Sequence, residues 1–191
     1  MKLQGSQTEK NLLAAFAGES QARTRYSFFS SVASKEGYEQ IAAIFQETSD
    51  NEKEHAKLFF NHLTYGSPVE ITASYPAGIV ATTADNLRAA AAGENLEWGT
   101  LYPSFGKIAD QEEFPAVANT FRQVAKVEAY HERRYLKLLS SIHEGTVFKK
   151  GSSIHWKCRN CGYVHESKDA PLQCPVCSHP RSYFEVWTEN Y

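Results

Sequence analysis

Two short motifs in the chain pair a glutamate with a histidine three residues later, Glu52-Lys-Glu-His55 and Glu128-Ala-Tyr-His131. A spacing of three places both side chains on one face of a helix, and in each case that face is otherwise apolar over several turns. An apolar face of this kind is normally buried, and burying a carboxylate is costly unless it is protonated, paired or bound to a metal. The two motifs therefore indicate a buried site that requires compensating charge.

Each motif is preceded by a similar segment, so the larger part of the chain reads as an internal repeat. Ala17-Gly18-Glu19 places a glutamate 33 residues before Glu52, and Ala92-Gly93-Glu94 places one 34 residues before Glu128. The repeat predicts two related helix pairs around a pseudo-twofold axis. One position breaks it, because the second half carries an additional glutamate, Glu97, where the first half has an alanine.

Four helices are predicted to carry these residues. Ser6-Gln-Thr-Glu9 forms a capping box at the start of the first helix, and Gly37 stands where that helix would end. The segment 66–82 contains two prolines, is too long for a turn and suits a crossover along a bundle. The predicted helices cover residues 8–35, 38–65, 83–111 and 115–144.

The ionisable residues fall close to the middle of each predicted helix, so helices packed side by side would bring them to one depth. A glutamate from each of two helices and a Glu-x-x-His pair from each of the other two form the known donor set of a four-helix site for two irons or two manganeses. Oxygen donors with one imidazole per metal suit these ions better than copper. A single Glu-x-x-His pair usually lies on a solvated face, but two pairs on apolar faces with matching acids favour a metal site. The predicted cluster contains Glu19, Glu52, His55, Glu94, Glu97, Glu128 and His131.

The third helix is predicted to be irregular. Pro103 lacks a backbone N–H and should kink that helix or force a local bulge. With a regular helical period, its buried face would comprise Leu87, Ala90, Glu94, Glu97, Leu101, Ser104 and Ile108.

Several other polar residues lie near the motifs. Tyr26 and Tyr102 follow the single glutamates by about two turns, where their hydroxyl groups can donate hydrogen bonds near the cluster, although a buried tyrosine is more often a packing residue. Three further side chains adjoin the donors but point off the apolar faces and are predicted to be surface groups: Glu54, Glu132 and Arg133. His62 is predicted to be a core or rim histidine.

All four cysteines of the chain lie in two Cys-x-x-Cys pairs, formed by Cys158 with Cys161 and Cys174 with Cys177. Four thiolates at this spacing predict a tetrahedral metal site, which is either structural zinc or redox iron. A module of about 35 residues cannot build a sufficient core, so the metal must contribute to its folding. Glycine after the second cysteine and nearby aromatic residues favour iron. The predicted divisions are a bundle over 1–146, a linker over 147–154 and a cysteine domain over 155–191.

Composition excludes several classes of function. The net charge of −2 is spread over interspersed acidic and basic residues, so no nucleic-acid or anionic-membrane partner is expected. Neither a secretion signal nor a membrane span is apparent, so a cytoplasmic location is expected. No Gly-x-Gly-x-x-Gly fingerprint occurs, so any NAD(P)H would be used by a separate reductase.

These features together resemble the rubrerythrin family over essentially the whole chain, because an Ala-Gly-Glu and Glu-x-x-His repeat is followed by a shortened rubredoxin-like tail. The resemblance implies an all-α ferritin-like four-helix bundle with one long crossover and a small rubredoxin-like iron domain. It makes the seven bundle residues di-iron ligands, with His55 exchanging with Glu97 as one iron changes oxidation state. Ser178 departs from the pattern, since rubredoxins commonly have glycine there.

The resemblance also implies a function. The expected activity is reduction of hydrogen peroxide to water by a non-haem di-iron peroxidase, with Glu97, His55, Tyr26 and Tyr102 as its catalytic residues, protecting the cell against oxidative stress. Electrons would come from rubredoxin or an NAD(P)H-dependent reductase through the four-cysteine iron, and the protein is expected to be a homodimer. Two alternatives remain: a ferroxidase or iron-storage protein of the ferritin type, and a non-catalytic structural zinc-ribbon protein with an inert bundle.

Overall fold

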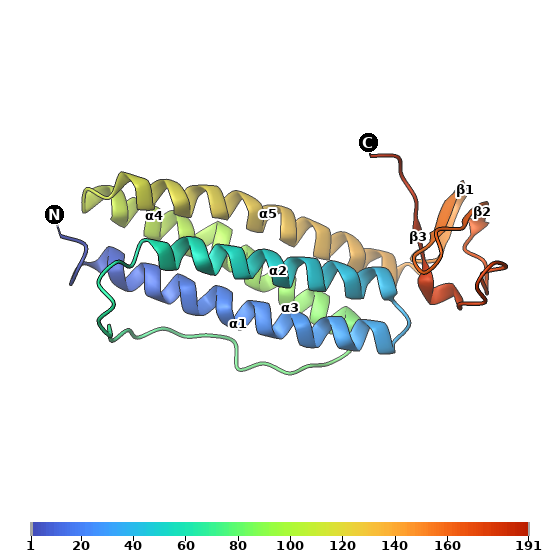
Figure 1. The fold of residues 1–191 in the computed structure, drawn as a ribbon, viewed down its shortest axis with the longest axis horizontal. Helices are drawn as coiled ribbons and strands as arrows, with labels where there is room; N and C mark the ends of the chain where they lie inside the picture. Colours follow the sequence, from blue (N-terminus) through green and yellow to red (C-terminus); the bar gives the residue numbers. More distant parts are fainter. Residues whose placement is uncertain (1, 191) are drawn as a thin grey trace.

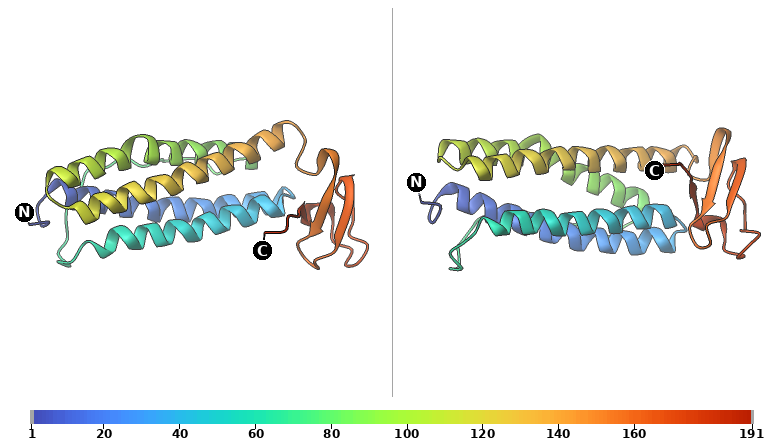
Figure 2. Two further views of the ribbon diagram at one scale, coloured as in Figure 1. Left: turned by 90° about the horizontal axis from the view of Figure 1, so that it is seen from above. Right: turned by 45° about the horizontal axis from the view of Figure 1, so that its top comes forward.

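The helices form four rods packed side by side in the computed structural model, which describes residues 2–190 (Figure 1). The third rod consists of three consecutive helical segments, and the views in Figure 2 show the same arrangement from two further directions. The helical elements are α1 (Gln7–Lys35), α2 (Glu39–Asn61), α3 (Thr83–Leu96), the π-helix η1 (Glu97–Leu101), α4 (Tyr102–Gln111) and α5 (Pro115–His143). The predicted bundle with one long crossover, between α2 and α3, is thereby confirmed. Within residues 2–190, every helix is too short or too polar to span a lipid bilayer.

Local signals explain both ends of α1 and the end of α2. The Ser6 side chain accepts a hydrogen bond from the backbone N–H of Glu9, and the Glu9 carboxylate accepts one from the N–H of Gly5, one residue earlier than in a standard capping box. Gly37 adopts a φ of 83°, which suits the end of α1. Helix α2 ends at Asn61, about a turn earlier than predicted. The backbone N–H groups of His62 and Leu63 bond to carbonyls three residues back, as in a 3-10 turn, and this ends the α-helical pattern.

The π-helix η1 ends two residues before Pro103, where the sequence predicts a kink or bulge. The N–H of Tyr102 bonds to the carbonyl of Glu97, five residues back, so the segment holds one residue more than a regular turn. This extra residue shifts the buried face of α4, and the predicted face of Leu101, Ser104 and Ile108 is wrong. The buried residues of α4 are instead Tyr102, Gly106 and Ala109.

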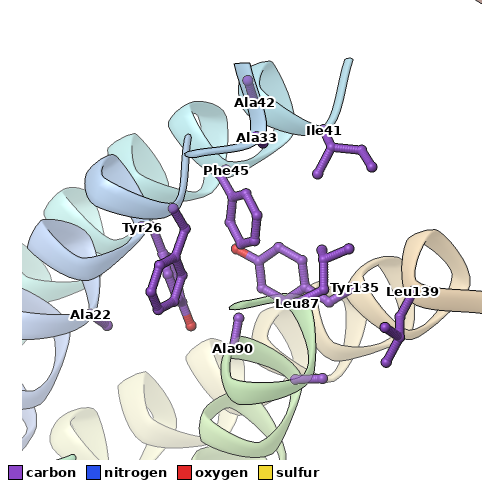
Figure 3. Close-up of a cluster of buried hydrophobic side chains, with 12 residues drawn as sticks. Ala22, Tyr26, Ala33, Ile41, Ala42, Phe45, Leu87, Ala90, Tyr135 and Leu139 are labelled. Atoms are coloured by element: carbon purple, nitrogen blue, oxygen red, sulfur yellow. The ribbon is translucent and has the colours of Figure 1, made fainter. Parts of the chain in front are cut away.

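Two hydrophobic clusters occupy opposite ends of the bundle. One contains Tyr26, Phe29, Phe45 and Tyr135, and Figure 3 shows several of its residues from all four rods converging. The other is built around Leu12, Phe59, Tyr102 and Phe121. The ionisable residues of the four rods fall between these clusters along the sequence of each helix, so apolar packing holds the polar centre from both ends.

A small sheet follows the bundle. Its strands are β1 (Lys149–Cys158), β2 (Val164–Asp169) and β3 (Phe184–Val186), antiparallel in the order β2-β1-β3, and a 3-10 turn, η2 (Arg181–Tyr183), precedes β3. Strand β1 begins at Lys149, inside the segment predicted as a linker, and its pairing with β2 is irregular across the polar residues before Ile154. The sheet lies at one end of the bundle (Figure 1), where Phe148 stacks on Tyr38 with ring centroids 6.1 Å apart.

Candidate metal centres

Two sets of potential donors meet in the centre of the bundle. In each set, one donor atom from every residue lies within 4.8 Å of the others. Glu52 of α2 and Glu128 of α5 belong to both sets, as bridging ligands between two metals would. The first set is Glu19, Glu52, His55 and Glu128, and the second is Glu52, Glu94, Glu128 and His131.

These donors are almost completely removed from solvent. Glu19, Glu94 and Glu128 have no exposed surface, and His55, the most exposed, retains 7%. Charged groups at this depth require neutralisation within the site. The repeat explains the convergence, because each half contributes one single glutamate and one Glu-x-x-His pair at the middle of its rods.

The orientation of the donors suits cations better than hydrogen bonds. Nδ1 of His131 lies 2.9 Å from Glu128 and 3.1 Å from Glu52, yet neither oxygen is placed to accept a hydrogen bond from it. Oxygens of Glu19, Glu94 and both oxygens of Glu128 are likewise buried without a hydrogen-bond partner among the described residues. Only Glu52 is aligned with Nδ1 of His55, at 2.9 Å. Atoms that face one another at such distances without a shared proton are arranged as ligands around a positive ion.

The protonation of the metal-free site leads to the same conclusion. Burial raises the pKa of Glu19 and Glu94 well above the usual range. Burial alone would lower the pKa of His55 and His131, but the adjacent carboxylates of Glu128 and Glu52 raise it to about 10 and about 12. Burial likewise opposes ionisation of Glu52, and the two histidines outweigh it and lower its pKa to about 2. Without metal, the cluster therefore holds protons where divalent ions would otherwise supply the charge.

Two buried tyrosines contact the single glutamates. The hydroxyl group of Tyr26 donates a 2.5 Å hydrogen bond to Oε1 of Glu94, and the hydroxyl group of Tyr102 donates a short one to Oε1 of Glu19. Burial raises the pKa of both tyrosines well above the usual range, so both remain protonated donors. The extra residue of η1 turns Tyr102 inward, which a regular helix would not have done.

Glu97 stands beside the two donor sets rather than in either of them. It lies in η1, is only partly exposed, and borders a cavity together with Tyr26 and Tyr102. Burial and the neighbouring carboxylates raise its pKa well above the usual range. The structure thus brings together six of the seven predicted bundle donors and places the seventh next to them.

The other polar residues near the motifs lie outside the cluster. Glu132 accepts hydrogen bonds from the Trp98 indole, at 2.6 Å, and from Asn95, and His62 pairs with Thr120. Tyr75, which lies in the crossover and lines the same cavity as Glu97, was not predicted from the sequence. No periodicity constrains a residue in such a segment, so only the packed structure reveals it.

The four cysteine sulfurs form a second cluster. Sγ of Cys158 lies 3.7 Å from Sγ of Cys177, and Sγ of Cys161 lies 3.6 Å from Sγ of Cys174. A metal bound by four thiolates at about 2.3 Å would separate neighbouring sulfurs by about 3.8 Å, so the spacing fits a tetrahedral ion. The backbone N–H of His179 lowers the pKa of Cys177 to about 6, which favours the thiolate that such an ion needs.

Comparisons with known proteins agree with this geometry. The family model named Rubrerythrin matches residues 10–139, and the model named Rubrerythrin, rubredoxin-like domain, matches residues 156–185. A rubrerythrin of Porphyromonas gingivalis is 62% identical over 99% of this chain and 94% of its own length. One from Nitratidesulfovibrio vulgaris is 50% identical over 99% of this chain and 98% of its own length.

Solved structures extend the agreement to the fold. A mixed-valence nigerythrin is 31% identical, with a TM-score of 0.64 over 96% of this chain and 87% of that chain. A bacterioferritin of Mycobacterium tuberculosis matches with a TM-score of 0.60 at 15% identity, over 72% of this chain and 86% of that chain, which supports the ferritin-like fold alone. With a di-iron type carboxylate and histidine site in its bundle and a rubredoxin-like four-cysteine site in its tail, this chain belongs to the rubrerythrin family.

Proposed function

We propose that this protein reduces hydrogen peroxide to water at the bundle site and thereby protects the cell against oxidative stress. The observation that carries the proposal is the coexistence, in one chain, of two buried donor sets sharing Glu52 and Glu128 with a four-thiolate site suited to one-electron transfer. A pair of irons in the bundle would supply the two electrons that cleavage of the O–O bond consumes. A ferroxidase would need the bundle donors but not the cysteines.

The ligand roles follow from the donor sets. Glu19, Glu52, His55 and Glu128 would hold one iron, and Glu52, Glu94, Glu128 and His131 the other. Cys158, Cys161, Cys174 and Cys177 would hold the third. We assign Glu97 as an additional carboxylate that would take the place of His55 as a ligand when one iron changes oxidation state, since Glu97 lies beside both donor sets.

The residues around the iron pair would manage protons. Burial and the neighbouring carboxylates raise the pKa of Glu97 in the metal-free site, which favours the protonated carboxyl group next to the cavity. Reduction of one peroxide to two waters consumes two protons, and Glu97 is placed to deliver one of them. Tyr26 and Tyr102 hold the single glutamates in position through their hydroxyl protons.

Electron delivery is proposed to involve a second subunit. Within one chain, the cysteine domain contacts the bundle at Tyr38, and Glu52 lies 14 residues further along α2, about 20 Å away at the helical rise. A homodimer could shorten this path by docking the cysteine domain of one subunit beside the bundle of the other. Rubredoxin or an NAD(P)H-dependent reductase in the cytoplasm would then reduce the four-cysteine iron.

Stopped-flow kinetics test the proposal. The reduced, iron-loaded protein should be reoxidised rapidly by hydrogen peroxide and slowly by dioxygen, with no iron mineral formed. Faster reaction with dioxygen and accumulation of mineral would instead assign a ferroxidase. Lack of the visible absorption of a ferric four-thiolate site in iron-supplied protein would favour structural zinc and remove the electron route.

A further inference from the structure

A cavity of about 870 Å³ lies between α1, the third rod and the crossover. It reaches Glu97, Tyr26 and Tyr102 on the side of the metal donors, and crossover residues 70–76 line it as well. Figure 1 shows the crossover running beside α1 along the bundle. The cavity therefore connects the space beneath the crossover with the side chains next to the donor sets.

Gly18 of α1 lines this cavity between Tyr75 of the crossover and Glu97 of η1. A Cβ atom at Gly18 would lie 3.7 Å from Cε1 of Tyr75 and 3.9 Å from Oε1 of Glu97. The crossover tyrosine and the η1 carboxylate thus approach the same point on α1, from which a side chain is missing. These distances are ordinary van der Waals contacts, so a methyl group would occupy the gap without a clash.

Tyr75 fixes the crossover at this point. Its hydroxyl group donates a 2.8 Å hydrogen bond to the carbonyl oxygen of Ala14, one helical turn before Gly18. Its side chain is 39% exposed, so the ring stands between solvent and the inner cavity. The hydrogen bond holds the Tyr75 ring in place, and the ring lines the side of the cavity that faces α1.

The repeat provides an internal comparison for Gly18. Gly93 occupies the equivalent position before Glu94 and also borders the cavity, but a Cβ there would meet nothing within 4 Å. Neither glycine has the positive φ that would exclude a side chain. Alanine would stabilise a helix at either position by about 1 kcal/mol. Helix stability therefore gives no reason for glycine at position 18, whereas an open passage does.

We propose that the cavity beneath the crossover is the route by which the oxidant enters, and that Gly18 and Tyr75 set the width of its inner passage. They would thereby determine which peroxides react, admitting hydrogen peroxide and retarding bulkier organic hydroperoxides. The inference rests on the proposed function for the identity of the oxidant. The route itself rests on the cavity and on the contacts at Gly18.

The matched pair Gly18→Ala and Gly93→Ala tests the passage. Azide is a small probe whose association with the iron-loaded, oxidised protein can be followed by stopped-flow absorbance without turnover. Gly18→Ala should slow azide association and the second-order reaction with hydrogen peroxide by about tenfold, whereas Gly93→Ala should match the unmodified protein in both. Thermal unfolding of each variant should occur at or above the temperature of the unmodified protein, which separates a blocked passage from a damaged fold.

Equal azide association rates in the unmodified protein, Gly18→Ala and Gly93→Ala would contradict the proposed route. If the unmodified protein fails to react with peroxide at all, the proposed function fails, and the azide rates still decide whether Gly18 lies on the path. A lower azide association rate in both glycine variants would also contradict the proposal, because only a Cβ atom at Gly18 would lie within 4 Å of facing side chains.

Substitution of Tyr75 tests the selectivity. Tyr75→Ala removes the ring and should raise the rate with cumene hydroperoxide, relative to hydrogen peroxide, by about tenfold. Tyr75→Phe retains the ring and should leave that ratio near its original value. Tyr65→Ala, which removes an exposed tyrosine that does not line the cavity, is the control. An unchanged ratio in Tyr75→Ala would exclude Tyr75 as a determinant of selectivity.

Discussion

The hydroxyl group of Tyr26 on α1 donates a hydrogen bond to Glu94 on α3, and Tyr102 makes the corresponding bond to Glu19 in the opposite direction. Each half of the repeat therefore positions the single glutamate of the other half. Both tyrosines are buried, with 2% and 1% exposure, in the two hydrophobic clusters at either end of the site. The packed core and the metal donors are thus linked through these two hydroxyl groups.

Tyr26→Phe and Tyr102→Phe should each lower peroxide turnover or iron affinity by roughly 10- to 100-fold, as loss of a hydrogen bond to a metal-binding side chain typically does. The rings remain, so thermal stability should change little. Turnover and iron content of purified protein provide the measurement, with the exposed Tyr130→Phe as the control. Full activity and full iron content in both variants would restrict the two tyrosines to packing.

Much of the site could be predicted because the bundle repeats regularly. The apolar faces of α2 and α5 and the mid-helix positions of the acids identified the donors, since a helix fixes both orientation and depth. The prediction was wrong in α4. Pro103 indicated a bulge, but its size and the resulting one-residue shift depend on packing, and this shift is what brings Tyr102 to Glu19.

Residues in irregular segments could not be predicted in the same way. Tyr75 lies in a crossover without helix or strand, so nothing in the sequence indicates that it contacts α1 near Gly18. The partners of Tyr26 and Tyr102 also depend on which rods are adjacent. Side-chain spacing along one helix does not determine contacts to another helix.

Glu97→Ala should retain the iron pair but reduce peroxide turnover by at least about 100-fold, because Glu97 is placed to donate a proton and lies outside both donor sets. Iron analysis and steady-state kinetics measure the two effects separately. Glu54→Ala changes an exposed glutamate that precedes His55 in the sequence but points away from the buried face of α2, and this variant should behave like the unmodified protein. Unchanged turnover in Glu97→Ala would remove this residue from the mechanism.

The metal-free protein should lose stability as the pH rises from 6 to 9. The raised pKa values of His55 and His131, about 10 and about 12, mean that their ion pairs stabilise the fold fully below about pH 6.5 and are lost as the pH approaches these values. The raised pKa of Glu19 acts in the same direction, because the folded state retains a proton that the unfolded chain releases above its ordinary value of 4.5. The lowered pKa of Glu52 changes the stability only at more acidic pH, below this range.

Calorimetry of the metal-free protein should therefore record a melting temperature that is lower at pH 9 than at pH 6 by about 5 °C or more. The iron-loaded protein should show a smaller change, since bound ions replace the protons. A metal-free protein whose stability is constant or rises over this range would show that the histidines are not paired with the carboxylates.

The two Cys-x-x-Cys pairs differ at the residue that follows the second cysteine, and substitutions at these two positions should have opposite effects on stability. Gly162 and Ser178 both have left-handed backbones, with φ of 79° and 59°, and only serine is strained there. Ser178→Gly should stabilise the domain by up to about 1 kcal/mol, after allowing for the greater freedom of glycine in the unfolded chain. Gly162→Ser should destabilise it by about 1 kcal/mol.

Loss of the visible absorption of the four-cysteine iron in guanidinium chloride would report both changes. The Ser178→Gly protein should release iron at higher denaturant concentration and the Gly162→Ser protein at lower concentration. Equal midpoints for all three proteins would mean that backbone strain does not limit this domain.

Anomalous diffraction at the iron absorption edge, from crystals of iron-loaded protein, tests the central claim most directly. We expect two peaks in the bundle, one enclosed by Glu19, Glu52, His55 and Glu128 and the other by Glu52, Glu94, Glu128 and His131, and a third peak among the four cysteines. A bundle with no peak, or with iron only on its surface, would contradict the assignment of this buried cluster as a di-iron site.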